Sequence, residues 1–137
     1  MNLSPLLETI LRFLLAAGLG AGIGYERERA GKAAGLRTHI LVSSGAALFT
    51  LVSIYGFSGA AVDISRVAAG VVVGIGFIGA GVILRGQREK EVAGLTTAAT
   101  IWITAAVGLA AGTGMYLISV IATAVTVGVL FLPKVRG

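Results

Sequence analysis

The sequence predicts an all-α membrane protein with five transmembrane helices in a single domain. Of its 137 residues, 56% are apolar and only 12% are charged, which is about half the charged share of a typical soluble domain. The charges form short clusters, and the apolar stretches between them approach the ~20 residues that a helix needs to cross a bilayer. Glycine is frequent, with 21 residues, which is typical of closely packed membrane helices.

The five predicted spans are joined by short connections. They cover Leu3 to Tyr25, Thr38 to Phe57, Arg66 to Leu84, Leu95 to Ala111 and Met115 to Leu132. The stretch before the first span has no basic n-region, and Glu8 and Arg12 interrupt the apolar run that follows. We therefore expect no cleavable signal peptide.

Basic residues in the connections predict the orientation of the spans. Nine of the eleven Lys and Arg residues lie in the first connection, the third connection or the C-terminal tail. Arg66 lies on the opposite side, and Arg12 lies within the first span. The positive-inside rule then places both connections and the C-terminus in the cytoplasm, and the N-terminus outside.

The chain also contains an internal repeat. A shift of 59 positions gives ten identities over the window from Gly20 to Ala47. The matches include Ala34 to Leu36, which fall on Ala93 to Leu95. We interpret this pattern as two parallel helix pairs, related by an axis along the membrane normal, plus one extra helix.

Small residues at helical spacing predict close helix packing, within one bundle or in a homodimer. The predicted packing glycines are Gly18, Gly20, Gly22, Gly74, Gly76, Gly79, Gly81, Gly108 and Gly112. An alternative interpretation is that glycines break the third span, and the matching end of the first span, at a substrate site.

The Ala-Gly-Leu segments precede the second and fourth spans. Thr38 and Thr97 are suitable N-cap residues for these helices, and Arg37 adds a full positive charge beside the first. Helix N-termini favour anions, so one hypothesis is a site for an anion, a lipid phosphate or a partner's carboxylate. Ordinary capping with membrane anchoring is the alternative.

Two groups of charged residues have structural and functional interpretations. The run Glu26-Arg27-Glu28-Arg29 alternates in sign and predicts either a solvated connector or a protein-docking surface. Glu8 and Arg12 lie four residues apart on one helix face, so we expect them to pair. A polar pathway is the alternative, because ionisable residues within a membrane span are functional candidates.

Composition excludes several function classes. The chain has no cysteine and only one histidine, His39, and it shows no nucleophile–base pair, phosphate-binding loop or metal-ligand cluster. We therefore expect a protein that is not an enzyme and has no cofactor, no metal site and no nucleic-acid partner.

Four stretches of the sequence resemble motifs of the MgtC/SapB family. They are Gly24 to Glu28, Ala34 to His39, Gly74 to Gly81, and Gly94 to Ala99 with Trp102. They occur in order and, with the fifth span, extend the resemblance over nearly the whole chain. By this resemblance the candidate functional residues are Arg12, Glu26, Arg27, Glu28, Arg37, Thr38, His39, Arg66, Thr96 and Thr97.

The resemblance implies a multi-pass protein of the bacterial inner membrane, linked to magnesium limitation and virulence. It also implies action through contacts with other membrane proteins, such as ATP synthase. We therefore expect a small non-enzymatic homodimer that regulates or associates with membrane complexes. The alternative is a transporter or channel for a small ion or solute. The family's founding member also has a cytoplasmic C-terminal domain, so we expect this sequence to correspond to the membrane domain alone.

Overall fold

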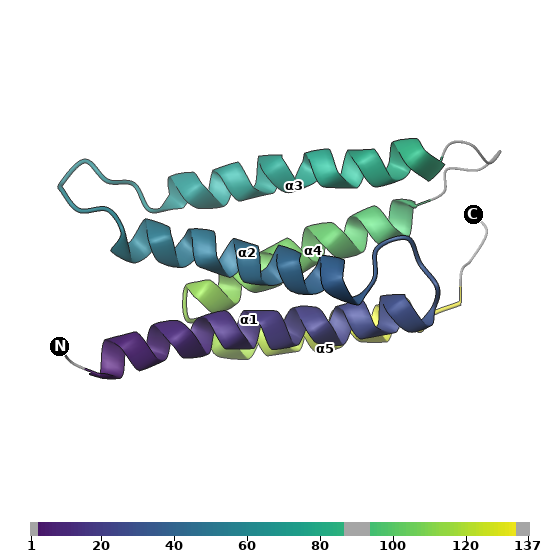
Figure 1. Ribbon diagram of the computed structural model, residues 1–137, viewed down its shortest axis with the longest axis horizontal. Helices are drawn as coiled ribbons and strands as arrows, with labels where there is room; N and C mark the ends of the chain where they lie inside the picture. The colour runs from purple at the N-terminus through teal and green to yellow at the C-terminus, as the bar shows by residue number, and fades with distance from the viewer. Residues whose placement is uncertain (1–2, 87–93, 134–137) are drawn as a thin grey trace.

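The computed structural model describes residues 3–86 and 94–133, and these residues form five helices and no strand. The helices are α1 (Leu3–Arg29), α2 (Leu36–Tyr55), α3 (Ser65–Gly86), α4 (Leu95–Gly112) and α5 (Tyr116–Leu130). Figure 1 shows them side by side along the long axis, with successive helices running in opposite directions. The all-α class is confirmed. Predicted features within residues 87–93 and 134–137 lie outside the described residues.

Each helix starts or ends one to four residues away from the bounds of its predicted span. Helix α1 continues past Tyr25 to Arg29, so the charged run is helical, and Gly31 follows with a φ of +68°. Helix α2 begins at Leu36 with Gly35 as its N-cap, and α4 begins at Leu95 with Gly94 as its N-cap. The predicted N-cap roles of Thr38 and Thr97 are therefore wrong, because both threonines lie inside the first helical turn.

The predicted glycine break is also absent. Helix α3 is continuous over 22 residues although it contains six glycines, and α1 is continuous over 27 residues. In an apolar medium the backbone N–H and C=O groups have no better partner than each other, so a glycine-rich segment remains helical. A substrate site made by unwound helices is excluded in this structure.

Four helices, α1 to α4, are long and apolar enough to cross a membrane. Helix α5 is apolar but has only 15 residues, or about 22 Å at 1.5 Å per residue, against a hydrocarbon core of ~30 Å. It is also shorter than the predicted span from Met115 to Leu132.

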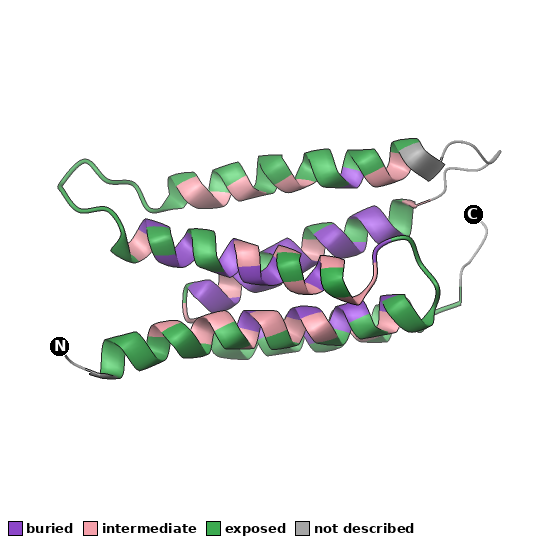
Figure 2. Ribbon diagram, in the orientation of Figure 1, coloured by how far each residue is buried: buried purple, intermediate pink, exposed green. Residues whose placement is uncertain are grey.

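Helix α4 is the centre of the bundle, because it contacts each of the other four helices. More than half of its residues are buried, whereas α3 is mostly exposed, with intermediate residues along one side (Figure 2). Small side chains fill the core, which is built around Ala16, Ala47 and Ala111. Most of the large apolar side chains instead point outwards, although Ile23 and Ile101 are fully buried. Outward-facing apolar side chains are expected when lipid rather than water surrounds the bundle.

Only some of the glycines lie at helix contacts within the chain. A Cβ added at Gly20 would lie 2.6 Å from the His39 carbonyl oxygen, and one at Gly112 would lie 2.9 Å from Thr50 Cβ. Gly108 lies against the backbone of Ser43, and a Cβ added at Gly79 would lie 3.5 Å from Ala98 Cβ. At the remaining predicted packing glycines an added Cβ would meet no atom of the described residues within 4 Å, so these glycines are not points of close helix approach within one bundle: Gly18, Gly22, Gly74, Gly76 and Gly81.

Candidate functional site

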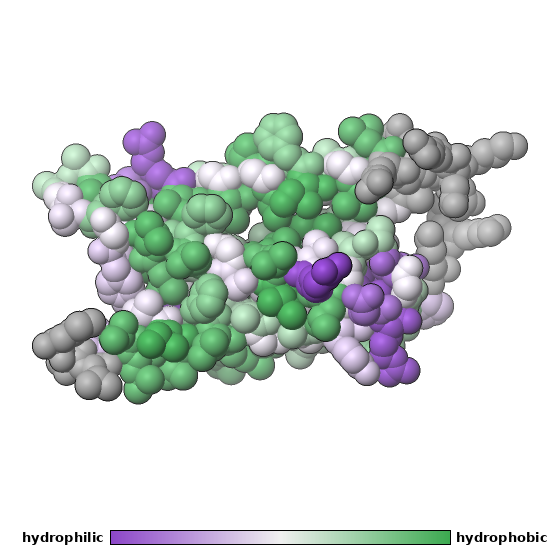
Figure 3. Space-filling view, viewed as in Figure 1, coloured by the Kyte–Doolittle hydropathy of each residue, from purple (hydrophilic) through white to green (hydrophobic). Residues whose placement is uncertain are grey.

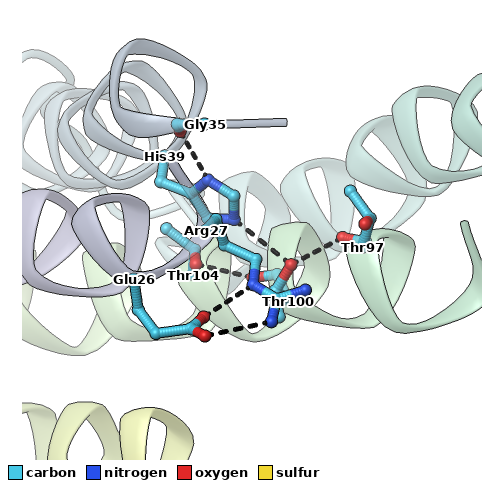
Figure 4. Close-up of polar contacts among 7 residues, drawn as sticks. All are labelled: Glu26, Arg27, Gly35, His39, Thr97, Thr100 and Thr104. Atoms are coloured by element: carbon cyan, nitrogen blue, oxygen red, sulfur yellow. Dashed lines mark hydrogen bonds and ion pairs between the residues drawn. The ribbon is translucent and has the colours of Figure 1, made fainter. Parts of the chain in front are cut away.

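A cluster of polar side chains lies where the C-terminal end of α1 meets the first half of α2 and of α4 (Figure 4). Helix α1 contributes Arg27, which is 3% exposed. Its Nε donates a hydrogen bond to Glu26 Oε2 at 2.8 Å, and its Nη2 donates to Glu26 Oε1 at 3.4 Å. This two-bond contact compensates the buried charge in the way that a low-polarity environment requires.

One nitrogen of the Arg27 guanidinium is not used. Nη1 is buried and has no hydrogen-bond partner within the described part of the chain. A buried N–H without a partner destabilises a fold by about 1–3 kcal/mol. Arg27 is therefore an energetically costly residue at this position and a candidate for more than a structural role.

His39 joins α2 to α4 inside the same cluster. Its ring is fully buried, with Nδ1 2.8 Å from the Gly35 carbonyl oxygen and Nε2 3.2 Å from Thr100 Oγ1. A carbonyl only accepts hydrogen bonds, so Nδ1 carries the proton, and in the neutral ring Nε2 accepts from the Thr100 hydroxyl. Because Thr100 Oγ1 also lies 2.7 Å from the Thr97 carbonyl oxygen, one hydroxyl proton serves two acceptors.

The other buried hydroxyl groups mostly bond to carbonyl groups of their own helix. This local bonding satisfies them without a partner on another helix. It involves Ser43, Ser44, Thr50, Thr104, Ser119, Thr123 and Thr126. His39–Thr100 is therefore unusual among the polar contacts of the core, because it crosses between helices.

Replacing Thr100 with valine tests this contact. Valine keeps the side-chain shape but leaves His39 Nε2 without its partner, so we expect a loss of about 1 kcal/mol in the free energy of unfolding, a typical value for hydrogen bonds between membrane helices. Unfolding by SDS titration in mixed micelles measures the change. Thr96→Val is the matched control because Thr96 is exposed. Equal stability of the two variants would contradict the prediction.

The side chain of Glu28, in the last turn of α1, reaches the N-terminal end of α2. Its Oε1 accepts a hydrogen bond from the backbone N–H of Leu36 at 3.0 Å, and its carboxylate lies against Gly35. The anion hypothesized for this helix N-terminus is therefore a carboxylate of the same chain. Negative charge is favourable there because of the partial positive charge at a helix N-terminus.

Arg12 and Glu8 form a second polar contact at the opposite end of the bundle. Arg12 Nη2 lies 2.6 Å from Glu8 Oε1, which confirms the predicted pairing. Arg12 Nη1 also donates to the carbonyl oxygen of Gly112 at 3.2 Å, and the Tyr116 hydroxyl donates to Glu8 Oε1 at 3.4 Å. Together these contacts join α1 to the end of α4 and the start of α5, where a cation complements the helix C-terminus.

Residues 13–136 match the MgtC family. The chain belongs to this family. YhiD of Escherichia coli (strain K12) is 50% identical over 129 residues, which are 90% of this chain and 59% of YhiD. SrpB of Synechococcus elongatus is 48% identical over 122 residues, or 82% of this chain and 67% of SrpB. MgtC of Salmonella typhimurium (strain LT2) is 47% identical over 107 residues, or 78% of this chain and 44% of MgtC.

No solved structure matches this MgtC-family chain. The chain spans about three-fifths of the length of YhiD and less than half of that of MgtC. The comparison therefore concerns the membrane helices, and the activities of the longer relatives come to this chain only as proposals.

The family-motif residues fall into three groups in the structure. Glu26, Arg27, His39 and Thr97 lie in the polar cluster at the α1–α2 end. Arg37 and Thr96 are exposed and Thr38 is half-buried on the first turns of α2 and α4. Arg66 is exposed near the start of α3, at the other end of the bundle (Figure 1).

Near Arg66, an acidic residue holds the first turn of α3. Asp63 Oδ1 accepts hydrogen bonds from Ser65 Oγ at 2.6 Å and from the Ser65 backbone N–H at 3.0 Å. These two bonds hold the pKa of the Asp63 carboxyl below its ordinary value. Asp63 is therefore a carboxylate at neutral pH and offsets part of the positive charge of Arg66.

Sequence reasoning missed two partners. The sequence did not identify Thr100 as the partner of His39, or Tyr116 as a partner of Glu8. The spacing of Thr97, Thr100 and Thr104 along one face was the available signal for the first. Nothing in the local sequence indicates the second, because Glu8 and Tyr116 lie 108 positions apart.

Proposed function

We propose that this chain is a small non-enzymatic protein of the bacterial inner membrane that regulates or associates with other membrane complexes. The observation that carries the proposal is the ordered α1–α2 connection. The N–H groups of Gly31 and Lys32 bond to the carbonyl oxygens of Glu28 and Arg27, both at 3.1 Å. These bonds support an exposed basic surface formed by Arg29, Lys32 and Arg37.

A fixed surface of this kind suits docking to a partner. Charged residues on a short, hydrogen-bonded connection lose little conformational entropy when they bind. The acidic residues of the same run are engaged within the chain, Glu26 with Arg27 and Glu28 with α2. The basic residues therefore remain available to an acidic surface of another membrane protein, and ATP synthase is one partner implied by the family resemblance.

The proposed topology has five spans, with the N-terminus outside and the α1–α2 connection in the cytoplasm. The positive-inside rule supports this orientation, and α5 can reach across with the apolar residues that flank it. Two observations support the proposed repeat. The first is that α2 and α4 begin at Leu36 and Leu95, 59 positions apart, and the second concerns the glycine contacts. Gly20 faces His39, and Gly79 faces Ala98, also 59 positions on.

The charged residues within the spans favour a structural role over a transport pathway. Arg12 bonds to Glu8 and to the α4 terminus, and Arg27 bonds to Glu26. The alternative function remains a transporter or channel for a small ion or solute. It is supported by the free Nη1 of buried Arg27 within the described chain and by the name of YhiD, which proposes magnesium transport for that protein.

The remaining family expectations are also part of the proposal. Homodimer formation is supported by Gly18 and Gly22 on α1 and by Gly76 and Gly81 on α3, where an added Cβ would meet no atom of the described residues within 4 Å, since such faces let helices approach closely. A link to magnesium limitation and virulence comes from the family resemblance alone.

Site-specific photocrosslinking in a bacterial host tests the docking surface. We expect a photoreactive residue at Lys32 to form an adduct with a specific membrane protein, and Arg29→Glu in the same chain to abolish it. A photoreactive residue at Ala61, in the α2–α3 connection at the opposite end, is the matched control. Magnesium flux into proteoliposomes containing the purified chain, above protein-free vesicles, would instead support transport and contradict the regulatory proposal.

A further inference from the structure

An apolar groove lies between α2 and α3 and reaches α4, on the face seen in Figure 3. Its volume is about 590 Å³. The lining includes Leu41, Gly45 and Phe49 from α2, and Val67, Gly70 and Gly74 from α3. Because α3 is otherwise exposed and strongly apolar, the groove opens onto the surface that faces lipid.

Glycines keep the groove open. A Cβ at Gly45, Gly70 or Gly74 would meet no atom within 4 Å. Near the start of α3, the two walls are joined by a hydrogen bond from Ser53 Oγ to the Ile64 carbonyl oxygen at 3.0 Å. Further along, α3 packs on α4 through Gly79 and Ala98. Between these two attachments α2 and α3 are separated by a space that an occupant must fill.

The dimensions of the groove fit an acyl chain. The lining extends from Leu41 to Phe49 on α2 and from Val67 to Ile78 on α3, which is about 12 Å and about 16 Å at 1.5 Å per residue. One leaflet is half of the ~30 Å hydrocarbon core. The groove runs along the helices, and thus along the direction that a lipid chain takes in a leaflet.

An arginine stands at each end of the groove. Arg37 precedes Leu41 by one helical turn, and Arg66 precedes Gly70 by one turn, so each shares a face with lining residues. Beside Arg66, the Asp63 carboxylate offsets the positive charge. At the other end Arg29 and Lys32 are also exposed, whereas the Glu28 carboxylate is engaged by Leu36 N–H.

We propose that the groove binds one acyl chain of an anionic phospholipid whose phosphate lies at Arg37. The excess positive charge at that end selects the headgroup, because basic residues near the membrane surface attract anionic lipid. The lipid fills the space between α2 and α3 and restrains α3, which is otherwise attached mainly to α4. Arg37 also belongs to the proposed docking surface, whereas the residues that line the groove do not, so substitutions in the lining test the lipid site separately from docking.

Native mass spectrometry of the full, delipidated chain tests the proposal, with phosphatidylglycerol and phosphatidylcholine as probes. We expect one phosphatidylglycerol to bind several-fold more tightly than phosphatidylcholine. Gly74→Leu fills the groove and should lower retention of both lipids at least tenfold. Gly45→Leu tests the same space from α2. Gly22→Leu is the matched control, since Gly22 lies on α1 with no atom near its Cβ position.

The assignment of the lipid headgroup to Arg37 is tested by comparing substitutions of the two arginines. Arg37→Gln should remove the preference for phosphatidylglycerol while phosphatidylcholine still binds, and Arg66→Gln should leave the preference unchanged. The proposal is overturned if Gly74→Leu and Gly45→Leu retain lipid like Gly22→Leu, or if Arg66→Gln alone removes the preference. Conversion of a dimer to a monomer by Gly74→Leu, with unchanged lipid binding, would identify a second copy as the occupant.

Discussion

Replacing Gly108 with alanine is expected to separate α2 from α4 and to destabilise the bundle by about 3 kcal/mol or more. The added methyl group would overlap the Ser43 carbonyl oxygen and lie 2.8 Å from Ser43 C and Cα. These are backbone atoms of α2, so no side-chain rotation relieves the overlap, and the loss reaches the upper end of overpacking effects. The movement would also break the His39–Thr100 bond. SDS titration in mixed micelles measures the free energy of unfolding.

A glycine outside the helix contacts supplies the control. A Cβ at Gly18 meets no atom within 4 Å, and alanine has the higher helix propensity by about 1 kcal/mol. Gly18→Ala should therefore be neutral or slightly stabilising. If Gly108→Ala proved as stable as Gly18→Ala, the close approach of α2 and α4 at Ser43 would be wrong.

Replacing Arg27 with methionine is expected to destabilise the protein by about 3 kcal/mol. Methionine fills similar space, but it leaves the largely buried Glu26 carboxylate without its partner, and removing one member of a buried ion pair typically has an effect of this size. The free energy of unfolding in mixed micelles again provides the measurement.

A double-mutant cycle separates the ion pair from packing. Glu26→Gln combined with Arg27→Met removes both charges and should recover much of the loss. Arg29→Met is the control, because it removes an arginine whose side chain is exposed from the same helix turn. Arg29 lies over the Tyr25 ring, 6.0 Å from the ring centre. A double variant no more stable than Arg27→Met alone would show that Arg27 contributes through packing or through another partner.

Much of the secondary structure was predictable from local composition. Apolar run length located all five helices, and the predicted starts of the second, third, fourth and fifth spans fall within two residues of those observed. The end of α1 was misplaced by four residues because its last turn is charged, and hydropathy reports membrane depth rather than helicity. The N-caps of α2 and α4 were misassigned because threonine is the better capping residue in water, whereas glycine occupies these positions here.

The candidate site was only partly predictable. Family motifs pointed to Arg27 and His39, and the structure places both in one cluster. The same resemblance included Arg37, which is exposed on the first turn of α2 beside the cluster, and Arg66, which is exposed at the other end of the bundle. A motif marks positions along the chain, but it does not indicate which side chains face the interior.

The sequence by itself was enough to place the chain in a lipid bilayer, to locate its helices and to indicate its family. The length of the apolar runs, the placement of the charges and the long motifs are all local properties of the sequence. The tertiary structure alone decided which glycines lie at helix contacts and which partners the charged residues have. Gly108 contacts α2 whereas Gly74 borders an open groove, although both belong to the same small-residue pattern. Arg12 bonds to Gly112, 100 positions away. Helical periodicity defines the face on which a residue lies, and only the packing of the helices determines what that face meets.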